Sequence, residues 1–185
     1  MSTCRCQPDC LTTIVIWLLV DHTYGARRSN LARVQEFDPE RFRTDTVALK
    51  TFNEQIIQEF RDNDGKVGGV FEDIGMLLLT ATGAKSGRPR LTTLAYFTID
   101  GAMVIVGSRG GAPKDPAWVH NLRANPQVRV EVGTESFMAT AREAMGEERD
   151  SLFGEIVSKQ PDFGAYQDKT TRIIPVFRLH RSDYE

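Results

Sequence analysis

The stretch LTTLAYFTIDGAMVIV at residues 91–106 decides the fold of this chain. Leu91 to Ile99 is rich in β-branched and aromatic residues, which favour extended strands. Asp100-Gly101 is a strong hairpin turn, and Met103 to Val106 is an apolar run that returns from it. The stretch therefore predicts two antiparallel strands joined by a tight turn.

Further short strands are predicted on both sides of this hairpin. Met76 to Thr80 is a short apolar run, and Gln127 to Gly133 alternates with valines on one side. Phe137 to Glu143 and Ile173 to Leu179 are the last two candidates. Six short strands, mostly joined by hairpins, predict an α+β, mainly β domain: an antiparallel barrel with flanking helices.

Three helices are expected around these strands. Thr51-Phe52-Asn53-Glu54 fits a capping box, so the first helix should begin near Thr51 and end at Asp62 to Gly65. Asp115-Pro116 predicts the start of a second, short helix with Asp115 as its cap. Glu147 to Lys159 is amphipathic and forms the third. The predicted buried faces consist of Phe52, Ile56, Ile57 and Phe60 in the first helix, Trp118 and Leu122 in the second, and Leu152, Phe153, Ile156 and Val157 in the third.

Residues 1–50 differ from the rest and are interpreted as an N-terminal extension to a domain at 51–185. Leu11 to Val20 is an apolar run of about half the length that a membrane-spanning helix requires. It fits a signal-peptide core, a helix on the membrane surface with Arg27, Arg28 and Arg33 as anchors, or a misassigned translation start. We expect a cytoplasmic protein, with peripheral contact to the inner face of the cell membrane as an option.

The three cysteines, Cys4, Cys6 and Cys10, all lie in this extension, which excludes a disulfide framework for the rest of the chain. They are interpreted as part of a reduced, disordered tail. The histidines His22, His120 and His180 have no metal-binding spacing, so no metal site is expected.

The charge is small overall but uneven along the chain. A formal net charge of -2 argues against nucleic-acid binding. Between Lys85 and Arg129, however, seven Lys and Arg residues are opposed only by Asp100 and Asp115. This local excess predicts a small anionic ligand.

Two glycine-rich basic loops fall within this region. Residues 83–90, GAKSGRPR, lie between two predicted strands, and residues 107–114, GSRGGAPK, precede the helix that carries Trp118. Glycines let backbone amides approach an anion closely, and arginine grips phosphate or carboxylate with two nitrogens. The alternative is that each loop is simply a polar turn. Trp118 with Asn121 and the lone Tyr166 are further candidates, for which packing and surface positions are the simpler interpretation.

At this point the sequence resembles the deazaflavin-dependent nitroreductase family. Residues 82–90, TGAKSGRPR, are similar to its element T-G-x-K-S/T-G-x-P-R. Residues 108–126, SRGGAPKDPAWVHNLRANP, are similar to its longer element, which keeps S-K/R-G-G-A and W-x-x-N-L-x-A-N-P at the same spacing. Tyr166-Gln167 with Thr170, Arg172, Ile174 and Pro175 also fit. The resemblance covers about residues 52–180.

The resemblance implies a split β-barrel of the FMN-binding, flavin-reductase type. It implies coenzyme F(420), an 8-hydroxy-5-deazaflavin with a phosphate and an oligoglutamate tail, as cofactor in preference to FMN. The implied reaction is hydride transfer from the reduced deazaflavin to a quinone, a nitroaromatic or a similar electrophile, in which the cofactor carries the chemistry. The alternative left open is a non-catalytic carrier of deazaflavin, flavin, haem or fatty acid. A homodimer is a further option.

The resemblance also implies roles for single residues. The phosphate and tail would be held by Lys85, Ser86, Arg88, Pro89 and Arg90. The ring system would lie against Leu91 and Thr92, and the cleft would be continued and braced by Ser108, Arg109, Gly110, Gly111, Trp118 and Asn121. Tyr166 and Ser108 are the catalytic candidates, with Tyr166 as a hydrogen-bond or proton donor to the substrate. Ala84 stands where a basic residue is common in the family, and Phe163 stands where some relatives have a second tyrosine.

Overall fold

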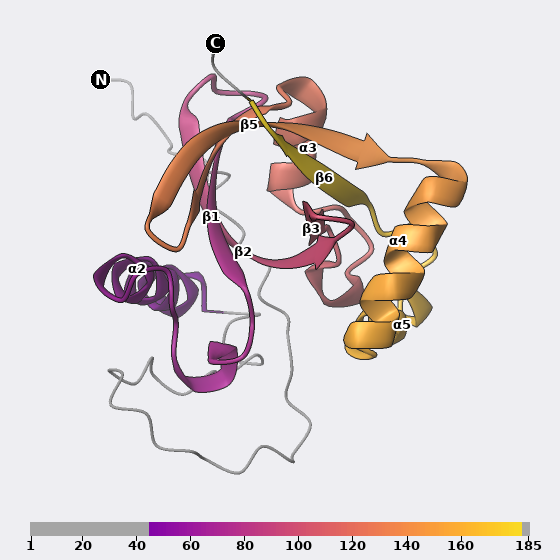
Figure 1. The fold of residues 1–185 in the computed structure, drawn as a ribbon, viewed down its shortest axis with the longest axis horizontal. Helices are drawn as coiled ribbons and strands as arrows, with labels where there is room; N and C mark the ends of the chain where they lie inside the picture. The colour runs from indigo at the N-terminus through magenta and orange to yellow at the C-terminus, as the bar shows by residue number, and fades with distance from the viewer. Residues whose placement is uncertain (1–44, 183–185) are drawn as a thin grey trace, which may run out of the picture.

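The computed structural model describes residues 45–182 of the chain. The cysteines and the apolar run of the predicted extension lie outside these residues. Six antiparallel strands close into a barrel in the order β1-β2-β3-β6-β5-β4 (Figure 1). They are β1 (Met76–Thr82), β2 (Pro89–Ile99), β3 (Ala102–Val106), β4 (Gln127–Val132), β5 (Glu135–Ala144) and β6 (Val176–Arg181). The predicted antiparallel barrel is thus confirmed.

The last strand begins three residues later than predicted. Ile173 is exposed, and the backbone N–H of Ile174 donates to the side-chain oxygen of Gln167 instead of to a strand. Pro175 follows and has no N–H to donate. These three residues therefore form a connection, and β6 starts at Val176.

The first helix, α2 (Thr46–Asp62), buries the predicted face but begins earlier than its predicted capping box. Its N-cap is Asp45, whose carboxylate accepts a hydrogen bond from the amide of Ala48 at 2.8 Å. Thr51 is therefore inside the helix, and Glu54 pairs with Lys50 on the next turn. The helix starts within the stretch that was assigned to the extension.

The cap predicted for the second helix is also wrong. Helix α3 (Ala117–Ala124) has Pro116 at its N-cap and no side-chain cap. The carboxylate of Asp115 instead bonds two arginines, Arg172 at 2.8 Å and Arg123 at 2.7 Å. Because two charged partners compete for this carboxylate, it is not available to the helix amides.

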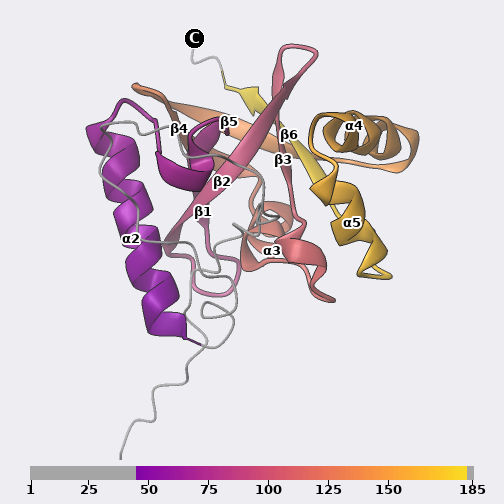
Figure 2. The same cartoon turned by 90° about the horizontal axis from the view of Figure 1, so that it is seen from below.

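Two helices near the C-terminus pack against the outside of the barrel. The amphipathic segment forms α4 (Gly146–Lys159), and a short helix that was not predicted, α5 (Asp162–Asp168), carries Tyr166. Figure 2 shows α2 on one side of β1, β2 and β3 and the pair α4 and α5 on the other.

The hydrophobic core has an inner and an outer part. The inner part fills the barrel, where Trp118, Val119 and Leu122 of α3 pack against inward-facing strand residues such as Leu79 and Val130. The outer part lies under α2, α4 and α5 and contains residues such as Phe60, Leu78, Val104 and Ile156. The strands are therefore covered on both faces over much of their length.

Among the described residues, β2 pairs with a strand on both of its sides over only part of its length. Residues Pro89 to Ala95 of β2 pair with β1, but β2 pairs with β3 only from Tyr96 to Ile99. The N–H of Tyr96 donates to the carbonyl of Gly75, next to β1, and the direction of backbone groups alternates along a strand. The backbone groups of Leu91, Thr93 and Ala95 therefore point away from β1, where no strand of the described residues pairs with them. We call this stretch the open edge of β2.

Candidate functional site

The basic turn between β1 and β2 uses its own amides to hold its shape. Gly83 N–H donates to the carbonyl of Arg88, and the amides of Ser86 and Gly87 donate to the carbonyl of Gly83. The amide of Ala84 donates to the side-chain oxygen of Asn121 at 2.9 Å. The expectation that this turn offers a cradle of free amides is therefore wrong for these four groups, and the turn offers its side chains instead.

These side chains are exposed at the start of β2. Lys85, Arg88 and Pro89 are exposed, whereas Arg90 is half-buried. The hydroxyl of Ser86 accepts from the guanidinium of Arg90 at 3.3 Å, which ties the turn to the first residues of the strand. The turn thus presents cations beside the open edge of β2.

Asn121 ties the turn to α3 through its hydrogen bond with the Ala84 amide, and its role in bracing a coenzyme cleft stays a prediction. Its neighbour Trp118 lies in the inner core with 2% of its surface exposed and packs edge-on against Phe177. Its indole N–H has no hydrogen-bond partner among the described residues. Trp118 supports the end of the barrel from within, and direct contact of this residue with a coenzyme stays a prediction.

The second predicted loop has an unusual backbone. Arg109, Gly110 and Gly111 all have positive φ, with values of 46°, 60° and 78°. Ser108 precedes them and is only 3% exposed. A Cβ placed on Gly111 would lie 2.5 Å from the carbonyl oxygen of Tyr166, so only glycine fits where this loop crosses α5.

Arg172 holds this loop and was not assigned to the site from the sequence. Its guanidinium donates to the carbonyls of Gly107, Ser108 and Ala112 at 3.0, 2.6 and 2.8 Å and to the carboxylate of Asp115 at 2.8 Å. These partners lie 57 to 65 residues away in the sequence, so spacing gave no signal. The one signal was the place of Arg172 in the C-terminal family element.

The pKa of Arg172 is lowered, mainly because its guanidinium is buried. Asp115 opposes this effect, and the like charges of Arg109 and Arg123 add to it. Hydrogen bonds with Glu143 and Asp115 raise the pKa of Arg123. Arg109, Arg123 and Arg172 therefore bring like charges together around this loop, with Asp115 between Arg123 and Arg172.

Leu91 and Thr92, the two residues expected to contact the ring system of the coenzyme, have side chains on opposite faces of β2. Thr92 is opposite Leu79, so its side chain faces the inner core, and its backbone groups, like those of Tyr96, point toward β1 and away from the open edge. Leu91 is half-buried on the outer face. Thr93, which was not predicted, is fully buried, and its hydroxyl has no partner among the described residues. An unsatisfied buried hydroxyl beside the open edge is a group that a bound ligand would satisfy.

Tyr166 belongs to a row of aromatic side chains on the outer face. Its ring meets Phe163 edge-on at 5.8 Å, and Phe163 meets Phe97 of β2 in the same way at 5.5 Å. The ammonium of Lys169 lies 5.6 Å from the Tyr166 ring centre. Tyr166 is 7% exposed, and this row leads from α5 onto β2.

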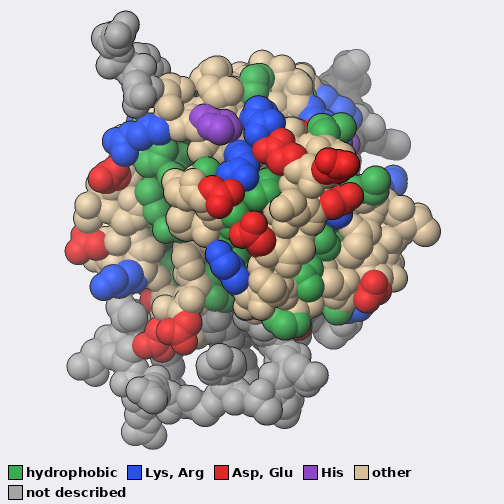
Figure 3. Space-filling view, turned by 45° about the vertical axis from the view of Figure 1, so that its right-hand side comes forward, with side chains coloured by type: hydrophobic (Ala, Val, Ile, Leu, Met, Phe, Trp, Pro, Cys, Tyr) green, Lys and Arg blue, Asp and Glu red, His purple; other side chains and the backbone are tan. Residues whose placement is uncertain are grey.

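Unpaired cations gather at this end of the molecule. In the part of the chain that the structure describes, no ion pair or hydrogen bond is made by the side chains of Lys66, Lys85, Arg88, Arg109, Lys114 or Arg129. All of these except Lys66 lie in or next to the two basic loops and the start of β4. On the face shown in Figure 3, by contrast, basic and acidic side chains are intermixed. The unpaired positive charge predicted for residues 85–129 is therefore present in three dimensions.

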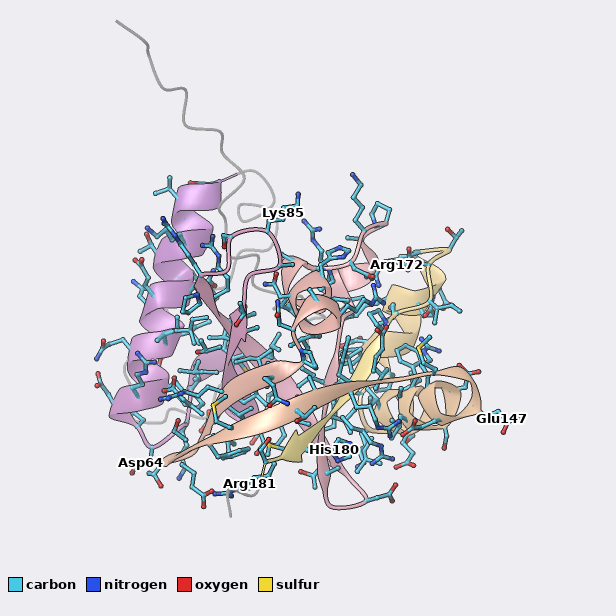
Figure 4. All side chains as sticks on the ribbon, turned by 90° about the horizontal axis from the view of Figure 1, so that it is seen from above. Asp64, Lys85, Glu147, Arg172, His180 and Arg181 are labelled. Carbon is cyan, nitrogen blue, oxygen red and sulfur yellow. The ribbon has the colours of Figure 1, made fainter. Side chains whose placement is uncertain are left out.

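A separate cavity of about 680 Å³ opens at the other end of the barrel. Its apolar lining includes Tyr96, Met103 and Phe137, and its rim carries His180 and Arg181. Figure 4 shows Lys85 and Arg172 toward one end of the molecule and His180 and Arg181 toward the other. Since Arg181 is paired with Glu135 and stacks on Phe137, this cavity lacks the unpaired charge of the basic end.

Residues 45–182 lack two further features. No helix in this range is long and apolar enough to cross a membrane. No three His, Cys, Asp or Glu side chains in the same range are grouped so that they could hold a metal ion.

The residues at the basic end fit a flat, anionic ligand. The open edge of β2 offers backbone groups and the Thr93 hydroxyl, the largely buried aromatic row lies on the outer face of the same strand, and the unpaired cations match a phosphate or carboxylate tail. The basic turn lies at the start of β2, and the aromatic row reaches β2 farther along the strand, at Phe97.

Comparison with known proteins gives the same picture. The family described as F(420)H(2)-dependent quinone reductase matches residues 53–181. An F(420)H(2)-dependent quinone reductase of Mycobacterium tuberculosis is 38% identical over 126 residues, which cover 66% of this chain and 85% of that protein. The solved structure of an F(420)-H2 dependent reductase is 42% identical with a TM-score of 0.52 and covers 57% of this chain and 94% of its own. A solved domain-swapped dimer is 40% identical with a TM-score of 0.54 and covers 75% of this chain and 99% of its own.

Proposed function

The chain belongs to the F(420)H(2)-dependent quinone reductase family, and we propose from this that it transfers hydride from reduced coenzyme F(420) to a quinone. The observation that carries the proposal is the gathering of unpaired cations beside the open edge of β2, within the residues that match the family. Nitroaromatics and similar electrophiles are proposed as further acceptors. The comparisons offer no support for the alternative of a non-catalytic carrier.

The coenzyme supplies the hydride when it is bound in its reduced form, and the protein binds and orients it. Lys85, Arg88 and Arg90 are proposed to hold its phosphate and tail through charge-assisted hydrogen bonds. The backbone of Leu91 and Thr93 on the open edge would hold the ring system. These assignments follow from the exposure and position of the side chains described above.

Tyr166 and Ser108 are proposed to act on the substrate side. The Tyr166 hydroxyl would donate a hydrogen bond or a proton to a quinone oxygen, and the edge-on contact with Phe163 fixes the direction of its ring. Ser108 is held at the start of the loop by Arg172. Both residues are largely buried, so we expect them to act only on a substrate group that enters the protein beside them.

The test is a fluorescence titration of F(420) with the wild-type protein and the variants Lys85→Ala and Arg88→Ala. Neither side chain has a partner among the described residues, so each substitution removes charge without breaking an internal contact. Loss of one charge-assisted bond should weaken binding about tenfold. Lys66→Ala, which removes an unpaired lysine outside the two basic loops, is the matched control.

Turnover is measured separately with reduced F(420) and a menaquinone analogue. The expected result is oxidation of the coenzyme only when the quinone is present. Tight binding of F(420) without turnover on any quinone would reject the catalytic part of the proposal. Equal binding by wild type and both charge variants would return the turn to a purely structural role.

We also propose that the chain forms a homodimer, which is supported by the similarity to a solved domain-swapped dimer. Its mass in solution, measured by light scattering, tests this. Peripheral contact with the membrane through the N-terminal extension is a further proposal that rests on its sequence alone.

A further inference from the structure

Arg172 lies in the connection between α5 and β6, and 14% of its side chain is exposed. All four of its side-chain hydrogen bonds go to one loop, residues 107–115. Three of the acceptors are backbone carbonyls, so the bonds define the path of the loop backbone and do not depend on the identity of those residues. A planar guanidinium with several donors in fixed directions suits this task.

The loop needs such support because its own sequence does not favour its conformation. Arg109 adopts a φ of 46°, in the left-handed region that is unfavourable for a residue with a Cβ. The amide of Gly111 donates to the carbonyl of Ser108, and the amide of Ala112 donates to the carbonyl of Arg109. The Ser108 carbonyl thus accepts from both Gly111 and Arg172, which ties the tight turn to the guanidinium.

The backbone of Arg172 is held by contacts that do not involve the loop. Its carbonyl accepts from the side-chain amide of Gln167 at 2.7 Å, and Gln167 in turn accepts from Arg149 at 2.9 Å. Asp115 is anchored a second time by Arg123, which also binds Glu143 of β5. The guanidinium therefore connects a fixed framework to a strained loop.

The geometry points to Arg172 as a positioning residue that fixes the Ser108–Gly111 turn so that Arg109 faces the anionic part of the coenzyme. This inference rests on the proposed function for the identity of the ligand. Arg109 has no partner among the described residues, and the like charge of Arg172 acts on it. An anion that binds at Arg109 would relieve this repulsion.

The experiment compares wild type with Arg172→Ala and Arg172→Lys and has two readouts. The first is hydrogen exchange of the Gly111 and Ala112 amides without coenzyme, which reports the turn directly. The second is the affinity for F(420). We expect faster exchange and an affinity about tenfold or more weaker in Arg172→Ala, with both effects reversed by added guanidinium. Arg172→Lys keeps the charge but lacks the planar set of guanidinium donors. It should therefore restore neither the slow amide exchange nor the coenzyme affinity fully.

Arg178→Ala is the matched control, because Arg178 is similarly buried and also bonds a backbone carbonyl and two carboxylates, but away from the loop. It should leave loop exchange and coenzyme affinity unchanged. Unchanged loop exchange in Arg172→Ala, full recovery by lysine, or an equal effect of Arg178→Ala would overturn the positioning role. If wild type fails to bind F(420) while loop exchange responds as expected, the proposed function fails and the positioning of the turn stands. If Arg172→Ala does not fold, Arg172→Lys carries both readouts.

Discussion

Gly111 is a residue at which backbone conformation and available space both exclude a side chain. Its φ is 78°, and a Cβ would meet the carbonyl oxygen of Tyr166 at 2.5 Å and Cβ of Lys169 at 2.8 Å. We expect Gly111→Ala to lower the free energy of unfolding by about 3 kcal/mol, since left-handed strain and overpacking add. Denaturant unfolding measures this.

Gly87→Ala is the matched control for this prediction. Gly87 has a similar φ of 65°, but a Cβ added there would meet nothing within 4 Å, so its substitution should cost only the strain, about 1 kcal/mol. An equal loss of unfolding free energy in Gly111→Ala and Gly87→Ala would show that the close contact between Gly111 and α5 does not restrict the residue at this position.

At the residue scale, sequence reasoning found the cations but not the contacts that hold them. Lys85 and Arg88 stand out because glycines and basic residues alternate in a short turn. Arg172 does not stand out in the sequence, since the hydrogen-bond partners of its guanidinium are more than fifty residues away. Asp115 was misassigned as a helix cap because a local rule was applied to a carboxylate that distant arginines engage.

Three elements on the outside of the barrel meet at Glu148 of α4. Its carboxylate bonds Arg142 of β5 and Arg178 of β6, and Arg142 and Arg178 lower its pKa below the ordinary value of 4.5. A lowered pKa in the folded state stabilises the fold above the unfolded-state pKa, and this stabilisation is lost as the pH falls through the folded-state pKa. The joint between α4 and the strands should therefore weaken in acid.

We expect the difference in Tm between wild type and Glu148→Gln to be constant above pH 4.5 and to shrink as the pH falls below it. Thermal melts over a pH series measure this. Glu147→Gln, which changes a neighbouring exposed glutamate, serves as control and should show no such trend. A difference that persists in strong acid would contradict the role of the ion pairs.

Elements were predicted more reliably in their type than in their ends. The valine alternation of β4 and the hairpin of β2 and β3 follow directly from side-chain periodicity. The start of α2 was missed because Asp45 caps it ahead of the Thr51 capping box. The open edge of β2 could not be predicted from the sequence, since it depends on the residue at which pairing with β3 stops.

Across the whole molecule, the distribution of paired and unpaired charge decides how coenzyme binding responds to salt. Exposed cations at the basic end are screened by added ions, so raising the salt from about 0.05 M to about 0.5 M should weaken the binding of F(420) severalfold. Titrations at several salt concentrations measure this. A deazaflavin without phosphate and tail should show little change, and an equal response of both ligands would contradict an electrostatic tail site.

The N-terminal extension gives a prediction that concerns the molecule as a whole. If residues 1–44 contact the membrane, the full chain should sediment with anionic lipid vesicles and a chain that begins at Asp45 should not. The deletion stops at residue 44 because α2 begins at Thr46. Equal sedimentation of the two chains would exclude the extension as the anchor.

The open edge of β2 also has a cost for the protein that carries it. Along this edge, backbone donors and acceptors that have no strand partner among residues 45–182 are a template for an extended peptide, including a strand from another copy of the chain. Pro89 and Arg90 at its start discourage such pairing, because proline lacks a donor and charge repels a like strand. If coenzyme binds along this edge as proposed, it would cover the rest and so would also protect the protein against such pairing.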